Sequence, residues 1–225
     1  MTDEREPLVV ADGLSLRTKQ GPVFADLHFT WPGLGPVAVT GPAGSGRSSV
    51  LLAVGGRMRG LTGRLSVAGI DAIRRPAEVR AITSVARIAD LVRLESRLRV
   101  AECITERALI DAVAPQRAEV GFGRLESTLG VAFPRQALVD DLPALEQTVL
   151  AVVLATLRPA RLVLLDDADA RIDLADQQRL FEALRTICAT LDTAIAFGTT
   201  ETAALPADLA RLDLTRPDSV TAPKD

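Results

Sequence analysis

The 225-residue sequence has few of the residues that mark several common classes of protein. It contains two cysteines and one histidine, and among its 26 basic residues only Lys19 and Lys224 are lysines. Cys103 and Cys188 lack the spacing and companions of a metal site, so we expect two buried thiols in a reducing compartment. His28 lies between two apolar residues of an alternating segment, which predicts an outward-facing side chain rather than a metal ligand or a base.

Long apolar runs and a strong excess of one charge are also missing. The longest uninterrupted apolar run, Val149–Ala155, is far shorter than the roughly 20 residues that a membrane-spanning helix needs. The N-terminus is charged and no apolar segment follows it, so we expect no signal peptide. A cytoplasmic protein is therefore predicted, with peripheral attachment to the inner face of the cell membrane as an alternative. A net charge of −3 provides no field for nucleic acid, so no nucleic-acid partner is expected.

A glycine-rich segment, Gly41–Ser49, is the most informative stretch of the sequence. It has the spacing of a phosphate-binding loop, between an alternating apolar run at Val37–Thr40 and a helix-compatible run at Ser48–Val54. Glycines let consecutive amides turn inward around an anion, and the N-terminus of the following helix adds its unpaired amides. Ser48 would supply a hydroxyl to Mg²⁺. The expected nucleotide-binding residues are Gly41, Pro42, Ala43, Gly44, Ser45, Gly46, Arg47, Ser48 and Ser49.

The cation of this loop is Arg47, where the pattern has lysine. Arginine keeps the charge, but its planar fork is larger than an ammonium group. Because nearly all basic residues of this chain are arginines, compositional bias alone can account for the change. A glycine-rich turn that binds nothing is the alternative interpretation of the loop.

Apolar periodicity organises the first half of the chain. Residues 8–31 alternate and predict an antiparallel β layer, and Ala81–Ala86 is predicted to be a further strand. Apolar positions such as Leu91, Leu94 and Leu98 recur at helical spacing. They predict a helical insertion that covers residues 88 to 140.

The second half predicts the rest of an α/β core. Leu145–Leu157 is apolar nearly all round and predicts a buried helix. Arg161–Asp166 is a continuous apolar run that ends in an acid, as in a parallel strand covered on both faces, and its carboxyl end would face the phosphate loop. Asp173–Leu191 is expected to be a helix with its first aspartate as N-cap. Thr193–Phe197 is predicted as the last strand, closing the sheet, and the tail after Leu214 as disordered.

With these motifs in this order, the chain resembles the ATP-binding cassette (ABC) ATPase family over almost its whole length. The segments Leu61–Gly69, Leu98–Glu102 and Arg158–Pro159 are also similar to segments of that family. The resemblance implies an α/β fold of the P-loop NTPase class: a RecA-like core with a mainly parallel sheet, an N-terminal antiparallel β layer and a helical subdomain. It implies one domain, divided into residues 1–87, 88–141 and 142–214, with a disordered tail at 215–225.

The resemblance assigns roles to two adjacent acids. Asp166 matches the family's acid that helps to hold Mg²⁺, so Ser48 and Asp166 are the expected metal ligands, and ATP and Mg²⁺ the expected cofactors. Asp167 stands where the family usually has the catalytic glutamate. A carboxylate remains, but it is one methylene shorter, and a displacement of about 1 Å can cost on the order of 100-fold in rate. For Asp169, acid at a strand end is a sufficient interpretation.

Other positions depart further from the family pattern. Thr199 stands in place of a histidine that contacts the γ-phosphate, and Thr18 falls near the place of an aromatic ring that stacks on adenine. Arg87 occupies approximately the place of a glutamine that senses nucleotide and the membrane partner, although a solvated charge is the simpler interpretation. We therefore expect weak nucleotide binding and impaired hydrolysis.

The largest departure lies at Leu142–Glu146, which replaces the family's Leu-Ser-Gly-Gly-Gln signature. In the family, this segment caps the γ-phosphate bound to the opposite subunit. Pro143 removes a hydroxyl and an amide donor. Leu145 would place a side chain where bare backbone must approach, and Glu146 would bring negative charge towards phosphate. This end of the chain is not expected to cap ATP.

Three functional hypotheses remain open at this stage. The first is an ABC subunit that binds Mg-ATP, hydrolyses it weakly or not at all, and works in a homo- or heterodimer with a membrane permease or ATPase partner. The second is an active transporter ATPase in a heterodimer whose partner supplies the intact signature. The third is a nucleotide-free scaffold in which Arg47 pairs with a local acid such as Asp166. A small-molecule kinase with a phosphate loop fits the long helical insertion less well.

Overall fold

The computed structural model describes residues 6–89 and 91–215. The strands are β1 (Val9–Thr18), β2 (Gly21–Trp31), β3 (Gly35–Thr40), β4 (Leu61–Val67), β5 (Ile70–Asp71), β6 (Thr83–Arg87), β7 (Leu162–Leu165), β8 (Ala194–Thr199) and β9 (Ala210–Asp213). The helices are α1 (Arg47–Val54), α2 (Pro76–Ile82), α3 (Val100–Ile110), α4 (Pro115–Leu129), α5 (Ala144–Ala155) and α6 (Leu174–Leu191), with a 3₁₀ turn at Val139–Asp141.

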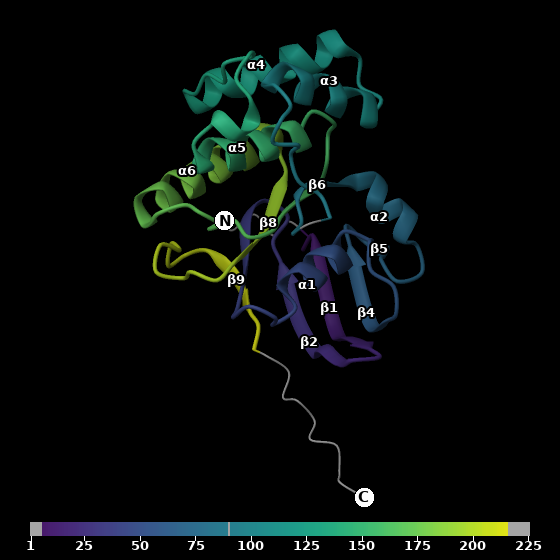
Figure 1. The fold of residues 1–225 in the computed structure, drawn as a ribbon. Helices are drawn as coiled ribbons and strands as arrows, with labels where there is room; N and C mark the ends of the chain where they lie inside the picture. Colours follow the sequence, from purple (N-terminus) through teal and green to yellow (C-terminus); the bar gives the residue numbers. More distant parts are fainter. Residues whose placement is uncertain (1–5, 90, 216–225) are drawn as a thin grey trace, which may run out of the picture.

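These strands form an antiparallel sheet and a parallel sheet in the described part of the chain. The antiparallel sheet has the order β2-β1-β4-β5, and the parallel sheet has the order β6-β7-β8-β3-β9. Figure 1 shows β1, β2 and β4 at one end of the molecule and the helices α3 to α6 towards the other. The predicted α/β P-loop fold, with an antiparallel layer and a mainly parallel core sheet, is therefore confirmed.

The parallel sheet is buried on both faces because successive side chains of its strands enter different cores. In β7, Leu162 and Leu164 pack on the side of α1 and the antiparallel sheet. Val163 and Leu165 pack on the other side, against residues of α3 to α6. Asp166, the residue that follows β7, lies at the carboxyl edge of the sheet, beside the end of β8 and the start of α1.

The scarce residues behave as the sequence predicts. Cys103 and Cys188 are free and buried, and burial raises the pKa of their thiols to about 11 and about 12. The side chain of His28 is 56% exposed, and its two ring nitrogens lie 2.9 Å from Asp12 Oδ1 and 3.0 Å from Asp26 Oδ1. None of the described helices combines the length and the hydropathy required to span a bilayer.

Two predictions in the first half of the chain were wrong in detail. The strand expected over Ala81–Ala86 begins at Thr83, because the preceding residues end α2. The helical spacing of Leu91, Leu94 and Leu98 does not form a helix, since α3 begins at Val100 and Leu91 is 72% exposed. Backbone hydrogen bonds instead hold this segment, among them Val139 N to Leu98 O at 2.9 Å and Asp140 N to Ser96 O at 3.0 Å.

The end of the sheet also differs from the prediction. The strand expected over Thr193–Phe197 is β8, which lies between β7 and β3 in the middle of the sheet. The edge is formed by β9, whose Leu212 pairs with Val39 of β3. In β9, Ala210 and Leu212 alternate with charged residues, but the strand has only four residues, which is too short a pattern to identify it from the sequence. The predicted disorder of the tail lies, from residue 216 onward, outside the described residues.

Candidate phosphate-binding site

The loop between β3 and α1 follows a backbone path that requires glycine. Gly41, Gly44 and Gly46 have φ values of 146°, 80° and 92°. A Cβ on Gly41 would lie 2.4 Å from the carbonyl oxygen of Leu214, and one on Gly46 would lie 3.0 Å from that of Val23. Gly41 and Gly46 thus combine a positive φ with close neighbours, so the loop can approach those neighbours only where it has no side chain.

Arg47, the first residue of α1, folds back over this loop. Its Nη1 donates to the carbonyl oxygens of Gly41 and Pro42, the latter at 2.9 Å. Its Nη2 lies 3.3 Å from Asp167 Oδ1, and the residue is 8% exposed. A local acid does pair with Arg47, as one of the sequence hypotheses suggests, but the acid is Asp167 rather than Asp166.

Asp166 is fully buried at the carboxyl end of β7. Its Oδ1 accepts a hydrogen bond of 3.0 Å from the amide of Asp167, and a Cβ on Gly198 would lie 2.4 Å from the same oxygen. Burial raises the pKa of Asp166 above its usual value, and a hydrogen bond from Ser48 counteracts only part of this effect. An ionised carboxylate in such a place needs a positively charged partner.

Three buried polar atoms around the N-terminus of α1 have no hydrogen-bond partner within the described residues. They are Ser45 Oγ, Arg47 Nε and Asp166 Oδ2. Native proteins pair the large majority of such atoms, so an orphaned group calls for an explanation. Ser45 Oγ and Arg47 Nε can donate hydrogen bonds to a phosphate, and the carboxylate oxygen of Asp166 can bind a cation. Together the three atoms fit a phosphate with a bound cation.

A metal site built only from the protein is not available here. No group of three or more His, Cys, Asp or Glu residues suited to a metal occurs among residues 6–89 and 91–215. Mg²⁺ is typically held by one or two carboxylates together with substrate phosphates and water. Asp166 and the hydroxyl of Ser48 therefore fit Mg²⁺ only as part of a metal–nucleotide complex.

The backbone of Asp167, just after β7, has a left-handed conformation with φ at 47°. Its side chain is 47% exposed. Arg87, at the end of β6, holds this turn from the other side. It donates to Asp166 O at 3.1 Å, to Asp167 O at 2.6 Å and to Thr148 Oγ1 at 3.2 Å. Burial lowers the pKa of Arg87. The interpretation of Arg87 as a solvated charge is therefore wrong, because its guanidinium ties the strand end to α5.

The hydroxyl of Thr199 and the carboxylate of Asp169 already have hydrogen-bond partners within the protein. Thr199 is buried, and its hydroxyl donates to Glu201 O at 3.0 Å. Asp169 Oδ2 accepts from Thr200 N, Thr200 Oγ1 and Glu201 N at 2.7 to 2.9 Å. This link between loops 31 residues apart was missed in the sequence, where nothing pairs an aspartate with a distant threonine.

The segment that replaces the family signature forms the start of α5. Pro143 is the N-cap residue and offers no side-chain hydrogen bond there. The prediction that Leu145 projects where backbone must approach was wrong, since the side chain is buried in the core together with Leu142. Gln147 Nε2 donates to Leu142 O at 2.8 Å, and Gln147 Oε1 accepts from Arg171 at 3.0 Å.

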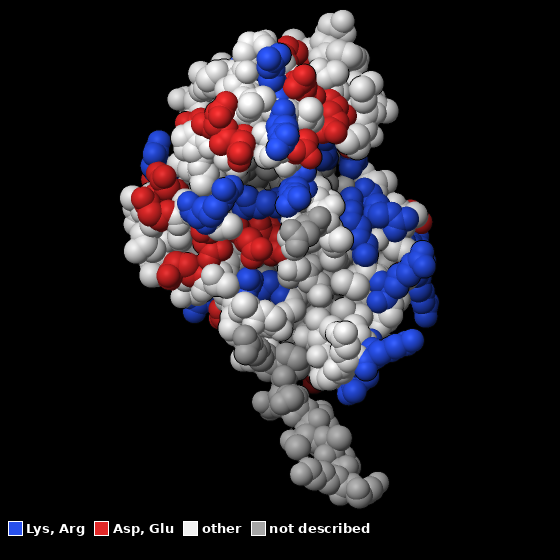
Figure 2. Space-filling view, in the orientation of Figure 1, with Lys and Arg blue, Asp and Glu red and all other residues white. Residues whose placement is uncertain are grey.

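A cavity of about 540 Å³ adjoins this region. Charged side chains of both signs line it, together with small apolar residues at the start of α5. Figure 2 shows a band of Lys and Arg across the middle of the molecule, with Asp and Glu directly below it. The lining residues that also belong to the candidate site or its supports are Arg87, Gln147, Asp167 and Arg171.

Comparison with known proteins supports the fold. No protein-family model matches the sequence. Molybdenum import ATP-binding protein ModC 1 of Azotobacter vinelandii is 29% identical over 210 residues, which cover 90% of this chain and 56% of that protein. The chain thus spans little more than half the length of this curated relative.

Solved structures of low sequence identity share the fold. CbiO1 of Clostridium perfringens, part of the ABC transporter complex CbiONQ, has a TM-score of 0.73 at 14% identity, over 88% of this chain and 80% of that one. A nucleotide-free ATP-binding cassette of an ABC transporter has a TM-score of 0.74 at 11% identity, over 93% and 88%. A cassette in its ADP conformation has a TM-score of 0.72 at 11% identity, over 89% and 84%.

Proposed function

We propose, from the premise that this chain is an ATP-binding cassette of the ABC type, that it binds Mg-ATP at Gly41–Ser49 and hydrolyses it weakly or not at all. The observation that carries the proposal is the set of unpartnered buried atoms at the start of α1. Asp166 carries the strongest argument, because its carboxylate is buried and its pKa is raised by that burial. A bound metal–nucleotide complex would supply the missing charge.

The residues divide into two groups by the part of the ligand they suit. The amides of the glycine loop and Arg47 suit the phosphates, whereas Ser48 and Asp166 suit Mg²⁺. Arg47 Nε has no partner among the residues that the structure describes and can donate to phosphate, but the loop carbonyls and Asp167 hold the same guanidinium, so a shift towards the phosphates would loosen those contacts. Binding therefore competes with an internal ion pair, which supports a weak affinity.

Weak hydrolysis follows from the surroundings of Asp167. A general base has to reach the attacking water, but the carboxylate of Asp167 is shared with Arg47. The hydroxyl of Thr199 is already donated within its loop and is buried. The start of α5 adds no capping hydroxyl, because Pro143 stands there. The site is thus better suited to holding nucleotide than to turning it over.

The partners belong to the same proposal. We infer a dimer with a second cassette, either identical or different, and a membrane permease subunit that would bring the chain to the inner face of the cell membrane. The cavity beside Arg87 and Gln147 would accept a cytoplasmic helix of that permease. The names of ModC 1, an import ATP-binding protein, and of CbiO1, part of a transporter complex, favour this role.

Calorimetric titration of Mg-ATP into the purified chain tests the nucleotide site. We expect binding that is lost in excess EDTA and in Ser48→Ala. A matched control is Ser127→Ala, because Ser127 is exposed on α4 and donates only to its own helix. Equal binding with and without Mg²⁺ would contradict the roles of Ser48 and Asp166.

A nucleotide-free scaffold is the second candidate, and the Arg47–Asp167 pair specifically favours it. If that pair permanently fills the site, no variant of the loop binds nucleotide, and Mg-ATP gives no thermal stabilisation. The active heterodimer makes a different prediction: turnover appears only with an intact second cassette and disappears in Asp167→Ala.

A further inference from the structure

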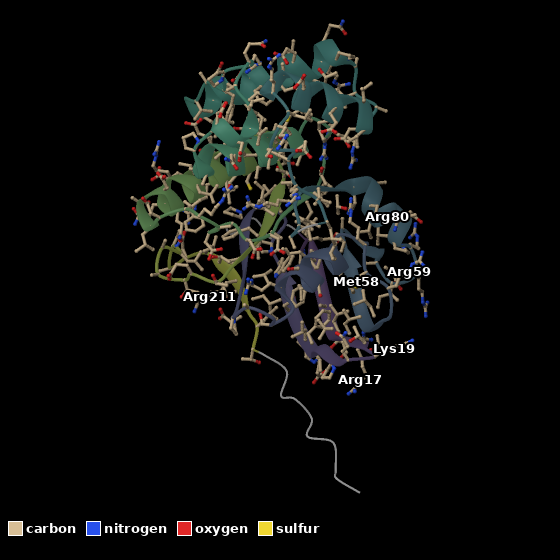
Figure 3. The ribbon with its side chains drawn as sticks, in the orientation of Figure 1. Arg17, Lys19, Met58, Arg59, Arg80 and Arg211 are labelled. Carbon is tan, nitrogen blue, oxygen red and sulfur yellow. The ribbon has the colours of Figure 1, made fainter. Side chains whose placement is uncertain are left out.

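Basic side chains gather along one flank of the molecule. Figure 3 labels Arg80, Arg59, Lys19 and Arg17 in succession down this side, and Figure 2 shows blue patches along the same side with uncharged surface between them. We call these four residues and the half-buried Arg57 the basic flank. The clustering is notable in a chain whose net charge is −3.

Backbone contacts place these residues together although they come from separate elements. Arg80 of α2 donates to Gly56 O at 2.9 Å, and Gly56 immediately precedes Arg57. The loop that carries Arg59 ends at Leu61, which pairs with Leu16 of β1. Arg17 and the β1–β2 turn with Lys19 follow directly. The basic flank therefore runs along adjoining elements from α2 to the tip of the antiparallel sheet.

Acids do not neutralise this surface. Within the described residues, Arg17, Lys19, Arg59 and Arg80 form no ion pair, and all four are exposed. Elsewhere the exposed arginines are of both kinds: Arg64, Arg185 and Arg211 pair with aspartates, whereas Arg97 and Arg117 form no ion pair among the described residues. The basic flank differs from these scattered positions because its unpaired charges come from neighbouring elements and lie along one side of the molecule.

Arg57, the half-buried residue of the basic flank, adds a further positive charge without an acidic partner in the described part of the chain. Arg57 donates to Gly55 O and to Thr83 Oγ1, with no acid among these partners. Burial, followed by the charges of Arg80, Arg158 and Arg107, lowers the pKa of Arg57 to about 10. A partner that brings negative charge to this flank would relieve the repulsion between these guanidinium groups.

The form of the flank favours an extended anionic partner. Its residues lie on the β1–β2 turn, on the loop between α1 and β4 and on α2, so they meet a broad surface rather than a small molecule. Single-stranded nucleic acid is usually bound with stacked aromatic rings, and the flank contributes none. A membrane rich in anionic lipid presents a broad negative surface that attracts each nearby Lys or Arg.

We propose that the basic flank docks this chain on the headgroups of anionic phospholipids. The anionic character of the partner rests on the unpaired charges alone, whereas the choice of a membrane rests on the proposed function beside a permease. Contact with lipid would supplement the attachment of the cassette to its permease partner. It would also orient the molecule at the bilayer.

Vesicle flotation with the purified full chain tests this proposal. The vesicles are phosphatidylcholine alone or phosphatidylcholine mixed with phosphatidylglycerol, at low and at raised salt. We expect binding only to the mixed vesicles and a loss of binding at raised salt. Arg17→Glu with Lys19→Glu should weaken binding by at least tenfold, since each removed charge near the surface costs about fivefold.

The control changes the same charge elsewhere. Arg185→Glu with Arg211→Glu alters two exposed arginines, of which Arg211 lies on the other side of the molecule in Figure 3. We expect its binding to stay within about twofold of the unmodified chain, because a charge beyond a Debye length is largely screened. Equal losses in both double variants, or equal binding to neutral vesicles, would overturn the proposal.

Two further readouts separate the possible failures. Binding to soluble polyglutamate without binding to mixed vesicles would overturn the lipid assignment in favour of an acidic protein partner. Mg-ATP titration of Arg59→Glu keeps the two proposals distinct: weakened lipid binding with ATP binding intact supports the flank. Lipid binding in a chain that binds no ATP would leave the flank supported and contradict only the nucleotide site.

Discussion

The guanidinium of Arg47 and the carboxylate of Asp167 face each other across the start of α1, with Nη2 3.3 Å from Oδ1. Both residues belong to the surroundings of the phosphate loop, yet here they satisfy each other. A nucleotide phosphate would have to share Arg47 with this carboxylate, since only Nε of the guanidinium is a buried donor without a partner in the described structure. The ion pair between Arg47 and Asp167 should therefore lower the affinity of the proposed site for nucleotide.

Changing Arg47 separates a working cation from one that only fills the site. Arg47→Ala should lower the affinity for Mg-ATP by about tenfold or more, because a hydrogen bond to a charged group contributes about 1.5–3 kcal/mol. Arg47→Lys should bind more tightly than the unmodified chain, since a compact ammonium makes fewer competing contacts with the loop carbonyls. Calorimetry gives both affinities, with Arg59→Ala as the control. Unchanged affinity in Arg47→Ala would rule out contact with phosphate.

Asp166→Asn should stabilise the free protein and abolish the effect of Mg²⁺ on nucleotide binding. The folded-state pKa of Asp166 is raised, so the folded state resists ionisation and stability falls as pH rises from the unfolded value through the folded one. Asparagine removes this loss. We therefore expect Asp166→Asn to be more stable than the unmodified chain near neutral pH in urea unfolding.

The opposite result would be equally informative for Asp166. A less stable Asp166→Asn protein near neutral pH would mean that the ionised carboxylate already has a partner that holds it in place. Asp141→Asn serves as the control, because Asp141 is exposed and only its backbone is engaged. Its stability should change by less than about 0.5 kcal/mol.

Arg87→Ala should destabilise the fold by about 2 kcal/mol, because it leaves three acceptors on β7 and α5 without their donor. The stability of Arg87→Gln should lie between those of the unmodified chain and Arg87→Ala, since an amide replaces only part of the guanidinium. Denaturant unfolding measures the difference, with the exposed Arg97→Ala as control. If Arg87→Ala is as stable as Arg97→Ala, the guanidinium does not hold the strand end.

The sequence predicted the parts of this fold that depend on local pattern. The apolar run at Arg161–Asp166 was recognisable because a strand buried on both faces has no polar alternation, and Asp173 as N-cap was confirmed by its bond from Asp176 N at 2.9 Å. What escaped prediction depends on distant contacts. Arg87 finds its partners 79 and 80 residues away, and β9 is held by its pairing with β3.

Two glycines with opposite surroundings form a matched pair. Gly198→Ala should cost about 1–3 kcal/mol, since the new Cβ would lie 2.4 Å from Asp166 Oδ1 inside the buried strand end. It should also weaken Mg-dependent ATP binding, because the carboxylate has to move. Gly121→Ala, on α4 with open space around the new Cβ, should instead stabilise by about 0.5–1 kcal/mol. Thermal unfolding of both variants checks this prediction, and equal effects would contradict it.

Asp169 should make stability depend on pH in the acid range. Burial raises its pKa, but hydrogen bonds from Thr200 and Glu201 outweigh this and bring the pKa below the usual value of 3.8. For an acid whose folded pKa is depressed, the stabilisation is fully present above the unfolded pKa and is lost as pH falls through the folded pKa. The link between the two loops should therefore weaken below about pH 4.

Asp169→Asn isolates this contribution. We expect a loss of about 1 kcal/mol near neutral pH, because an amide oxygen accepts the bonds from Thr200 and Glu201 less strongly than a carboxylate. Below the pKa of Asp169 the two proteins should converge, since protonation then weakens the same bonds in the unmodified chain. Urea unfolding across the acid range measures both curves. Parallel curves at every pH would mean that Asp169 contributes through packing and not through its charge.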